Sequence, residues 1–140
     1  MTLSLEELRE KIRIRLKDEP EINYLLGEEE FTDGQIDCAL DDALGIWNEE
    51  PPYIDEYETP DVFPWPRFLI RGAIGELYQI AAAHYRREQL SYSAGGVAID
   101  DKNKAPEYES VGQNYRSEYR TFIRDRKREI NFNNMFRIVY

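Results

Sequence analysis

The chain has 140 residues, which suits one domain of common size, and its 41% of hydrophobic residues exclude a chain that is disordered throughout. The net charge of −10 weakens any case for nucleic-acid binding, and the single cysteine excludes a disulfide within the chain. The first residues lack the apolar stretch of a signal peptide, and no segment approaches the roughly 20 apolar residues of a membrane helix, so we expect a soluble protein made in a cytoplasm.

Charge is distributed unevenly along the chain. Residues 18–66 contain sixteen acidic residues and neither lysine nor arginine, whereas residues 67–140 carry thirteen basic and nine acidic residues. A molecule with one acidic and one mildly basic end can stack head to tail with its copies, or face two different surroundings. The alternative is a solvated acidic face that only aids solubility.

Apolar side chains at helical spacing predict a first helix over residues 4–17 and a second over residues 33–49. Each begins with the residue spacing of a capping box. The capping pairs are Ser4 with Glu7 and Thr32 with Gln35. We expect Cys38, which sits on the second helix beside Ala39 and Leu40, to be a buried small hydrophobic residue.

A proline-rich passage follows the second helix. Residues 50–66 hold five prolines, which exclude a regular helix or a central strand. Aromatic and aliphatic residues between the prolines argue against a loose linker. The passage is therefore predicted to be an ordered, extended loop packed on the domain surface.

Two longer helices are predicted in the second half, over residues 66–91 and 105–130. Apolar residues cover a wide arc of the first of these, which is typical of a helix buried on several sides or packed on a neighbouring subunit. Gly72 and Gly75 within it favour the close approach of another helix. The apolar side of the last helix is formed by Tyr108, Val111, Tyr115, Tyr119, Phe122 and Ile123.

Two segments outside these helices have features typical of segments that contact a neighbouring molecule. Residues 91–104 are longer than a helix connection requires, and their paired glycines predict a short hairpin-like projecting loop. The loop residues expected to meet a neighbour are Tyr92, Gly95, Gly96, Val97 and Ile99. Residues 131–140 are predicted to form an extended arm that either packs back on its domain or docks on a partner. Its apolar residues are Phe132, Met135, Phe136, Ile138, Val139 and Tyr140.

The sequence carries no recognisable catalytic motif, phosphate-binding loop or paired metal-ligand spacing, and with one cysteine and one histidine, His84, it offers few nucleophiles or bases. We therefore expect no enzymatic activity, no cofactor and no metal. Asp37 with Asp41, and Asp100 with Asp101, are weak candidates for a hard cation, and solvation or turn formation is the preferred interpretation. The basic cluster near the end of the last helix suits phosphates or a salt-bridged partner. Its members are Arg120, Arg124, Arg126, Lys127 and Arg128.

Three stretches together resemble the head–tail connector proteins of tailed bacteriophages, small helical adaptors that bind beneath the portal ring. They are FTDGQIDCALDDALGIWNEEPPYIDEY, FPWPRFLIRGAIGELYQIAAAHYRREQLSYSAGGVAIDDKNKAPEY, and the basic helix with its apolar tail. The resemblance spans residues 31–140, and LSYSAGGVAIDDKNKA is its most distinctive part. It rests on the layout of the chain and on local sequence similarity rather than on a diagnostic catalytic motif.

The resemblance implies a ring of copies, commonly twelve, that docks on the portal protein, continues the DNA channel and meets the next neck or tail-completion protein. DNA would pass through without sequence-specific binding. The arm at residues 131–140 would dock on the portal, and the loop at residues 91–104 would contact a neighbour or the neck. The protein would belong to the virion, at the head–tail interface, after assembly in the host cytoplasm.

The sequence thus predicts a mainly α protein: one helical domain over residues 1–130, a bundle of about four helices, with a C-terminal docking arm at residues 131–140. The leading functional hypothesis is a virion connector adaptor. One alternative is an acidic helical protein–protein interaction module outside a virion. Another is an enzyme that depends on a metal held by the acidic helix, which a large metal-linked shift in thermal stability would support.

Overall fold

The computed structural model describes residues 2–16, 31–94 and 105–138. These residues form four α-helices and one short 3-10 turn, in the order α1 (Leu5–Leu16), α2 (Asp33–Glu49), η1 (Pro60–Val62), α3 (Pro66–Ala94) and α4 (Ala105–Ile138). The predicted mainly α bundle is therefore confirmed. None of the described helices combines the length and apolar character needed to cross a lipid bilayer.

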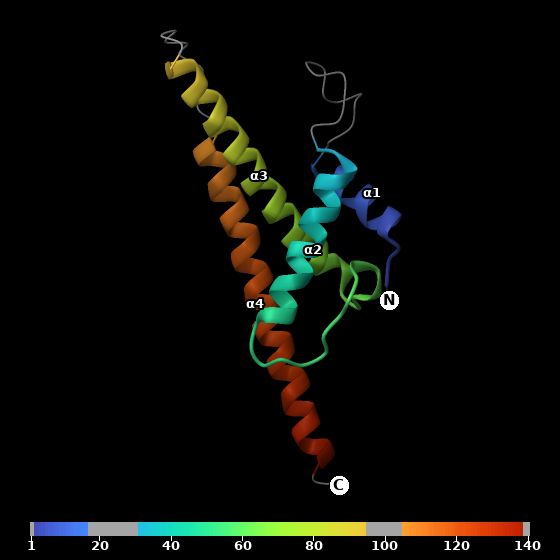
Figure 1. Cartoon of the computed structure of the whole chain (residues 1–140). Helices are drawn as coiled ribbons and strands as arrows, with labels where there is room; N and C mark the ends of the chain where they lie inside the picture. Colours follow the sequence, from blue (N-terminus) through green and yellow to red (C-terminus); the bar gives the residue numbers. More distant parts are fainter. Residues whose placement is uncertain (1, 17–30, 95–104, 139–140) are drawn as a thin grey trace.

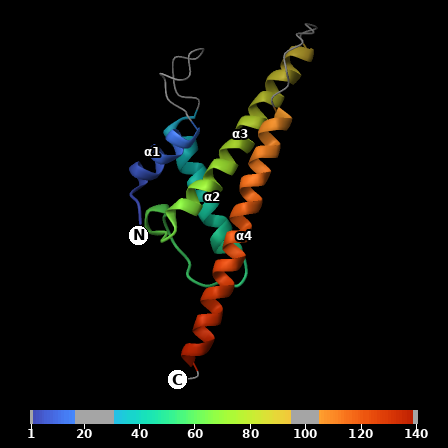
Figure 2. The same cartoon turned by 180° about the vertical axis from the view of Figure 1, so that it is seen from behind.

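The long helices α3 and α4 run side by side in opposite directions (Figures 1 and 2). Helix α2 crosses them, and α1 lies at the edge of the bundle away from α4. Helix α3 contacts each of the other three helices. Its buried residues consequently surround much of its circumference, as the wide apolar arc predicted. The fully buried members include Leu69, Ala73 and Leu77.

The beginnings of α1 and α2 follow from local hydrogen bonding. The Ser4 hydroxyl accepts from the Glu7 backbone N–H at 3.2 Å. The Thr32 hydroxyl accepts from the Gln35 N–H at 3.1 Å, and the Gln35 side chain accepts from the Thr32 N–H at 3.0 Å. These bonds satisfy amide groups that a helix N-terminus leaves without partners, so both predicted caps are confirmed.

Glycine lets α3 and α4 approach closely. A Cβ atom added at Gly72 would lie 2.7 Å from the Tyr119 ring. Gly75 and Gly112 face each other across the two helices, since a Cβ on Gly75 would lie 3.2 Å from the carbonyl oxygen of Gly112. The predicted close approach is confirmed, and Gly112, rather than its neighbour Val111, is the α4 residue at the contact. Val111, which was expected on the apolar side, is 38% exposed because Gly112 takes the inward position.

The proline-rich passage packs as an ordered loop around an aromatic cluster, as predicted. Trp47 donates its indole N–H to the Asp55 carbonyl oxygen at 2.8 Å. Its ring also lies 5.3 Å from that of Phe63, which is fully buried. Asn48 exchanges hydrogen bonds with the backbone of Tyr57, which fixes the middle of the loop against the end of α2.

Three expectations were wrong. Helix α3 continues to Ala94, so the first four residues of the predicted loop at 91–104 are helical. Helix α4 continues to Ile138, so the predicted arm at 131–140 is helical rather than extended over all its described residues. A helix already formed gains one hydrogen bond per added residue, and neither glycine nor proline interrupts residues 131–138. Cys38 is exposed rather than buried.

Candidate interaction surfaces

The C-terminal part of α4 projects beyond the rest of the molecule (Figure 1). The antiparallel pairing brings the start of α3 against the middle of α4, where the rings of Phe68 and Phe122 stack with centroids 3.8 Å apart. Among the α4 side chains that the structure describes, Ile130 is the last that packs against the core. Beyond it Phe132 is 58% exposed and Met135 is 64% exposed. The projecting end therefore places two large apolar side chains in contact with water.

These two residues belong to the predicted docking arm. Phe136 and Ile138 continue the α4 backbone, while Val139 and Tyr140 lie outside the described residues. Of the predicted loop residues, Tyr92 is in the last turn of α3. Gly95, Gly96, Val97 and Ile99 lie outside the described residues, as do Asp100 and Asp101.

The predicted basic cluster is divided between structural and exposed positions. Lys127 is fully buried and donates hydrogen bonds to the carbonyl oxygens of Trp47 and Glu50 at the C-terminal end of α2. Its ammonium also lies 4.9 Å from the centre of the Trp47 ring. A cation there stabilises the negative end of the helix dipole. Burial lowers the pKa of Lys127, and the charges of Glu50, Glu56 and Asp55 act in the opposite direction.

Arg126, half-buried, lies over the Trp65 ring at 5.2 Å, and Arg124 pairs with Glu50 at 3.2 Å. Together with Lys127, three of the five cluster members thus hold α4 against the aromatic cluster and α2. Arg120 and Arg128 are exposed and form no ion pair with another described residue. The sequence indicated a basic surface, but it did not indicate that Lys127 serves as a buried helix cap.

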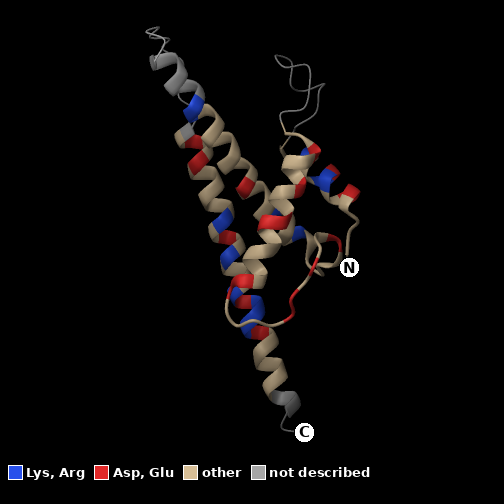
Figure 3. Cartoon of the chain, in the orientation of Figure 1, with Lys and Arg blue, Asp and Glu red and all other residues tan. Residues whose placement is uncertain are grey.

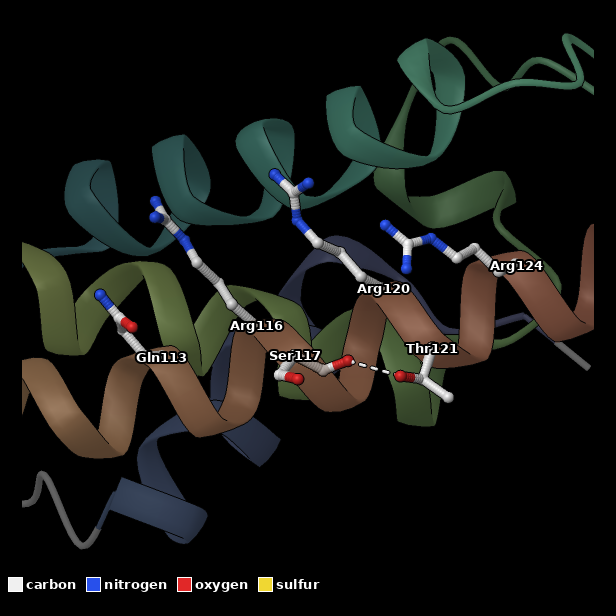
Figure 4. A pocket seen from close by; sticks show the side chains of 6 residues that line it. All are labelled: Gln113, Arg116, Ser117, Arg120, Thr121 and Arg124. Atoms are coloured by element: carbon white, nitrogen blue, oxygen red, sulfur yellow. Dashed lines mark hydrogen bonds between the residues drawn. The ribbon is translucent and has the colours of Figure 1, made fainter.

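An open pocket of about 360 Å³ lies along α4. Two parallel rows of side chains line it, because residues four apart lie on the same helix face. The first row is Arg116, Arg120 and Arg124, and the second is Gln113, Ser117 and Thr121. Figure 4 shows the three guanidinium groups extending from α4 toward α2. We call this site the arginine pocket. Only its arginines at 120 and 124 were in the predicted cluster.

Arg116 is already engaged inside the pocket. Its Nε and Nη2 atoms donate to the two carboxylate oxygens of Glu76 at 2.8 and 2.9 Å. Glu76 is buried on α3, so this bidentate pair fixes α4 to α3 and raises the pKa of Arg116. Burial, followed by the charge of Glu76, raises the pKa of the nearby Asp42 carboxyl on α2.

Two carboxylates of the acidic segment, residues 18–66, form ion pairs with arginines of α1. Asp37 receives two hydrogen bonds from Arg9, at 2.7 and 2.6 Å, so it ties α2 to α1 rather than standing with Asp41 at a cation site. Arg13 donates to Asp33 at 2.7 Å and lowers its pKa. Among the described residues, no group of three histidine, cysteine or acidic side chains is arranged to hold a metal ion.

The thiol of Cys38 and the imidazole of His84 are both exposed, on α2 and α3. The Cys38 sulfur lies 4.0 Å from a carboxylate oxygen of Asp42, one turn further along α2. His84 is exposed on α3, and its ring lies 5.6 Å from that of Tyr85.

Comparisons with known proteins gave no relative for this chain. No protein-family model matches it, and neither a curated protein nor a solved structure matches it.

Proposed function

We propose that this chain is a virion structural protein without catalytic activity, a connector adaptor that forms a ring beneath the portal of a tailed bacteriophage and joins the DNA-filled head to the neck. One observation carries the proposal. Helix α4 runs past the packed body and holds Phe132 and Met135 in water at 58% and 64% exposure. Exposed apolar residues on a projecting element are typical of a surface that a partner covers.

The proposed mechanism is assembly. Burying apolar surface supplies association energy, and a projecting helix can enter a partner without disturbing the body that carries it. In this proposal the end of α4 docks on the portal protein. Copies of the chain complete the ring, and a neck or tail-completion protein binds the opposite side. The resemblance of residues 31–140 to connector proteins supports the same order of partners.

The acidic half has a defined part in the proposal. Residues 18–66 carry no positive side chain, and Figure 3 shows acidic residues along the described part of the loop between α2 and α3. A negatively charged surface repels phosphates, so DNA would pass through the channel without adhering to it. The protein would then act in the virion after assembly in the host cytoplasm.

The experiment is to measure binding of the purified portal protein from the same genome by co-sedimentation. The variant Phe132→Asp with Met135→Asp should lose portal binding, since each aspartate must be desolvated on docking. Ile14→Asp is the matched control, because Ile14 is 56% exposed on α1, away from α4. It should bind like the unmodified chain.

Two results would contradict the proposal. One is portal binding that survives both substitutions on α4. The other is an unmodified chain that shows no affinity for the portal at any salt concentration, which would favour the free-standing acidic interaction module.

A further inference from the structure

The arginine pocket contains two cations, Arg120 and Arg124, that have N–H donors not used by described residues. Arg120 is exposed and forms no ion pair with another described residue. Arg124 donates only its Nε group to Glu50 among the described contacts. Since a guanidinium carries five N–H donors, these two side chains retain most of their capacity to bind carboxylates.

A surface of the opposite kind lies on the loop between α2 and α3. Glu56 and Glu58 are both exposed, while Tyr57 between them packs against the core. Alternation along the chain therefore directs the two carboxylates to solvent. Neither forms an ion pair with another described residue. Tyr53 and Val62, at 69% and 47% exposure, add apolar surface on either side. We call residues 53–62 the acidic loop.

The spacing of the two surfaces matches. Arg120 and Arg124 are one helical turn apart, which separates them by about 6 Å along α4 at 1.5 Å per residue. Glu56 and Glu58 are two residues apart in a non-helical segment, which separates them by roughly 6 to 7 Å. Two carboxylates can thus meet two guanidinium groups in register. The pairing does not occur within the chain, where Glu50 is the acidic residue that reaches Arg124.

We propose that the arginine pocket of one copy binds the acidic loop of a second copy, with Arg120 and Arg124 receiving Glu56 and Glu58. When the pocket and the loop of one copy engage two different neighbours, the contact is heterologous; it then repeats from copy to copy and closes into a ring if the rotation between copies allows. This inference deepens the proposed function by naming the surfaces that join neighbours in the ring. It concerns copies of this chain alone, so the portal is not needed to test it.

The contact should be weak and sensitive to salt when the chain is alone. Exposed ion pairs each contribute little and are screened at high ionic strength. A ring multiplies such contacts, because each copy is held by two neighbours.

The test is sedimentation velocity of the full chain in about 50 mM and about 500 mM salt, concentrations between which charge screening rises strongly. The structure predicts self-association at low salt that is lost at high salt. Arg120→Glu should weaken it by about fivefold or more. Arg87→Glu is the matched control, since Arg87 is exposed on α3, outside the pocket, and should leave the association within about twofold.

A mixing experiment tests the direction of the contact. The Arg120→Glu variant keeps an intact acidic loop, and the double variant Glu56→Gln with Glu58→Gln keeps an intact pocket. Each should associate poorly alone. A mixture should give one-to-one complexes and nothing larger, because each pair has only one working contact.

Three results would overturn the inference. The first is a full chain that stays monomeric at low salt up to about millimolar concentration. The second is an equal loss of association in the Arg120→Glu and Arg87→Glu variants, which would indicate net charge alone. The third is low-salt complexes that contain nucleic acid and disappear after nuclease treatment. None of these results bears on portal binding by the end of α4, which the aspartate variants test separately.

Discussion

Replacing Lys127 by methionine tests the buried cation at the junction of α2 and α4. Methionine keeps most of the aliphatic volume but cannot donate to the carbonyl oxygens of Trp47 and Glu50. Each buried carbonyl that loses its donor costs about 1 to 3 kcal/mol. Relief from burying the charge offsets part of that cost. The expected net loss is about 2 kcal/mol of unfolding free energy.

For a chain of this size, that loss corresponds to a fall of about 6 °C in the melting temperature. Circular dichroism with heating and with urea measures both quantities. Arg128→Met is the matched control, since the neighbouring Arg128 is exposed and forms no ion pair with a described residue. The control should change stability by less than about 0.5 kcal/mol. A Lys127→Met protein as stable as the control would refute the capping role and indicate that desolvation cancels the hydrogen bonds.

Further predictions concern helix packing, pH dependence and the end of α4. Gly112→Ala should destabilise the protein by about 1 to 3 kcal/mol, because the added Cβ would lie 3.1 Å from the carbonyl oxygen of Gly75. Gly45→Ala should instead stabilise it by about 0.5 to 1 kcal/mol, because nothing lies within 4 Å of a Cβ at that position and alanine has the higher helix preference. Stability in urea should fall as pH rises above about 10, since burial raises the pKa of Tyr119, so that the folded state keeps a proton that the unfolded state loses. Tyr119→Phe should make that alkaline fall shallower. Deleting residues 131–140 should leave the melting temperature within about 3 °C, since residues 131–135 are exposed.

Each of these predictions has a contradicting result. Equal effects of the two glycine substitutions would refute the close contact between α3 and α4. An alkaline fall that is unchanged in Tyr119→Phe would assign it to other phenols, of which Tyr57 also has a pKa raised by burial. Unfolding of the truncated chain would place the end of α4 in the core and remove the basis of the docking proposal.

Sequence periodicity predicted most of the fold because the helices are separated by proline, glycine and capping residues. The starts of α2 and α3 were predicted to the residue, since Thr32 and Pro66 are strong local signals. The end of α4 was not predicted, because an asparagine-rich sequence has a weak helix preference that an existing helix overrides.

Two side chains were misjudged from chemical type rather than position. Cys38 follows the buried Ile36 by two residues, which places it about 200° around α2 and therefore on the outer face. Lys127 follows the buried Ile123 by four residues, which places it on the inner stripe of α4. Helical position thus indicated that Cys38 is exposed and that Lys127 is buried, whereas cysteine is usually buried and lysine is usually exposed.

The candidate surfaces were only partly predictable. Apolar composition indicated that residues 131–140 either pack back on the domain or dock on a partner, and the structure exposes Phe132 and Met135 on a projecting helix. The arginine pocket depends on which arginines already have carboxylate partners. Arg116 pairs with Glu76, forty residues earlier in the chain, and such a long-range contact has no local signal in the sequence.

The most direct test of the connector proposal is the mass of the complex that forms when the purified chain is mixed with the portal protein from the same genome, measured by native mass spectrometry. The account predicts a ring-on-ring assembly with matching or simply related subunit counts, and its loss when residues 131–140 are removed. A chain that stays unbound across salt and protein concentrations would contradict the account.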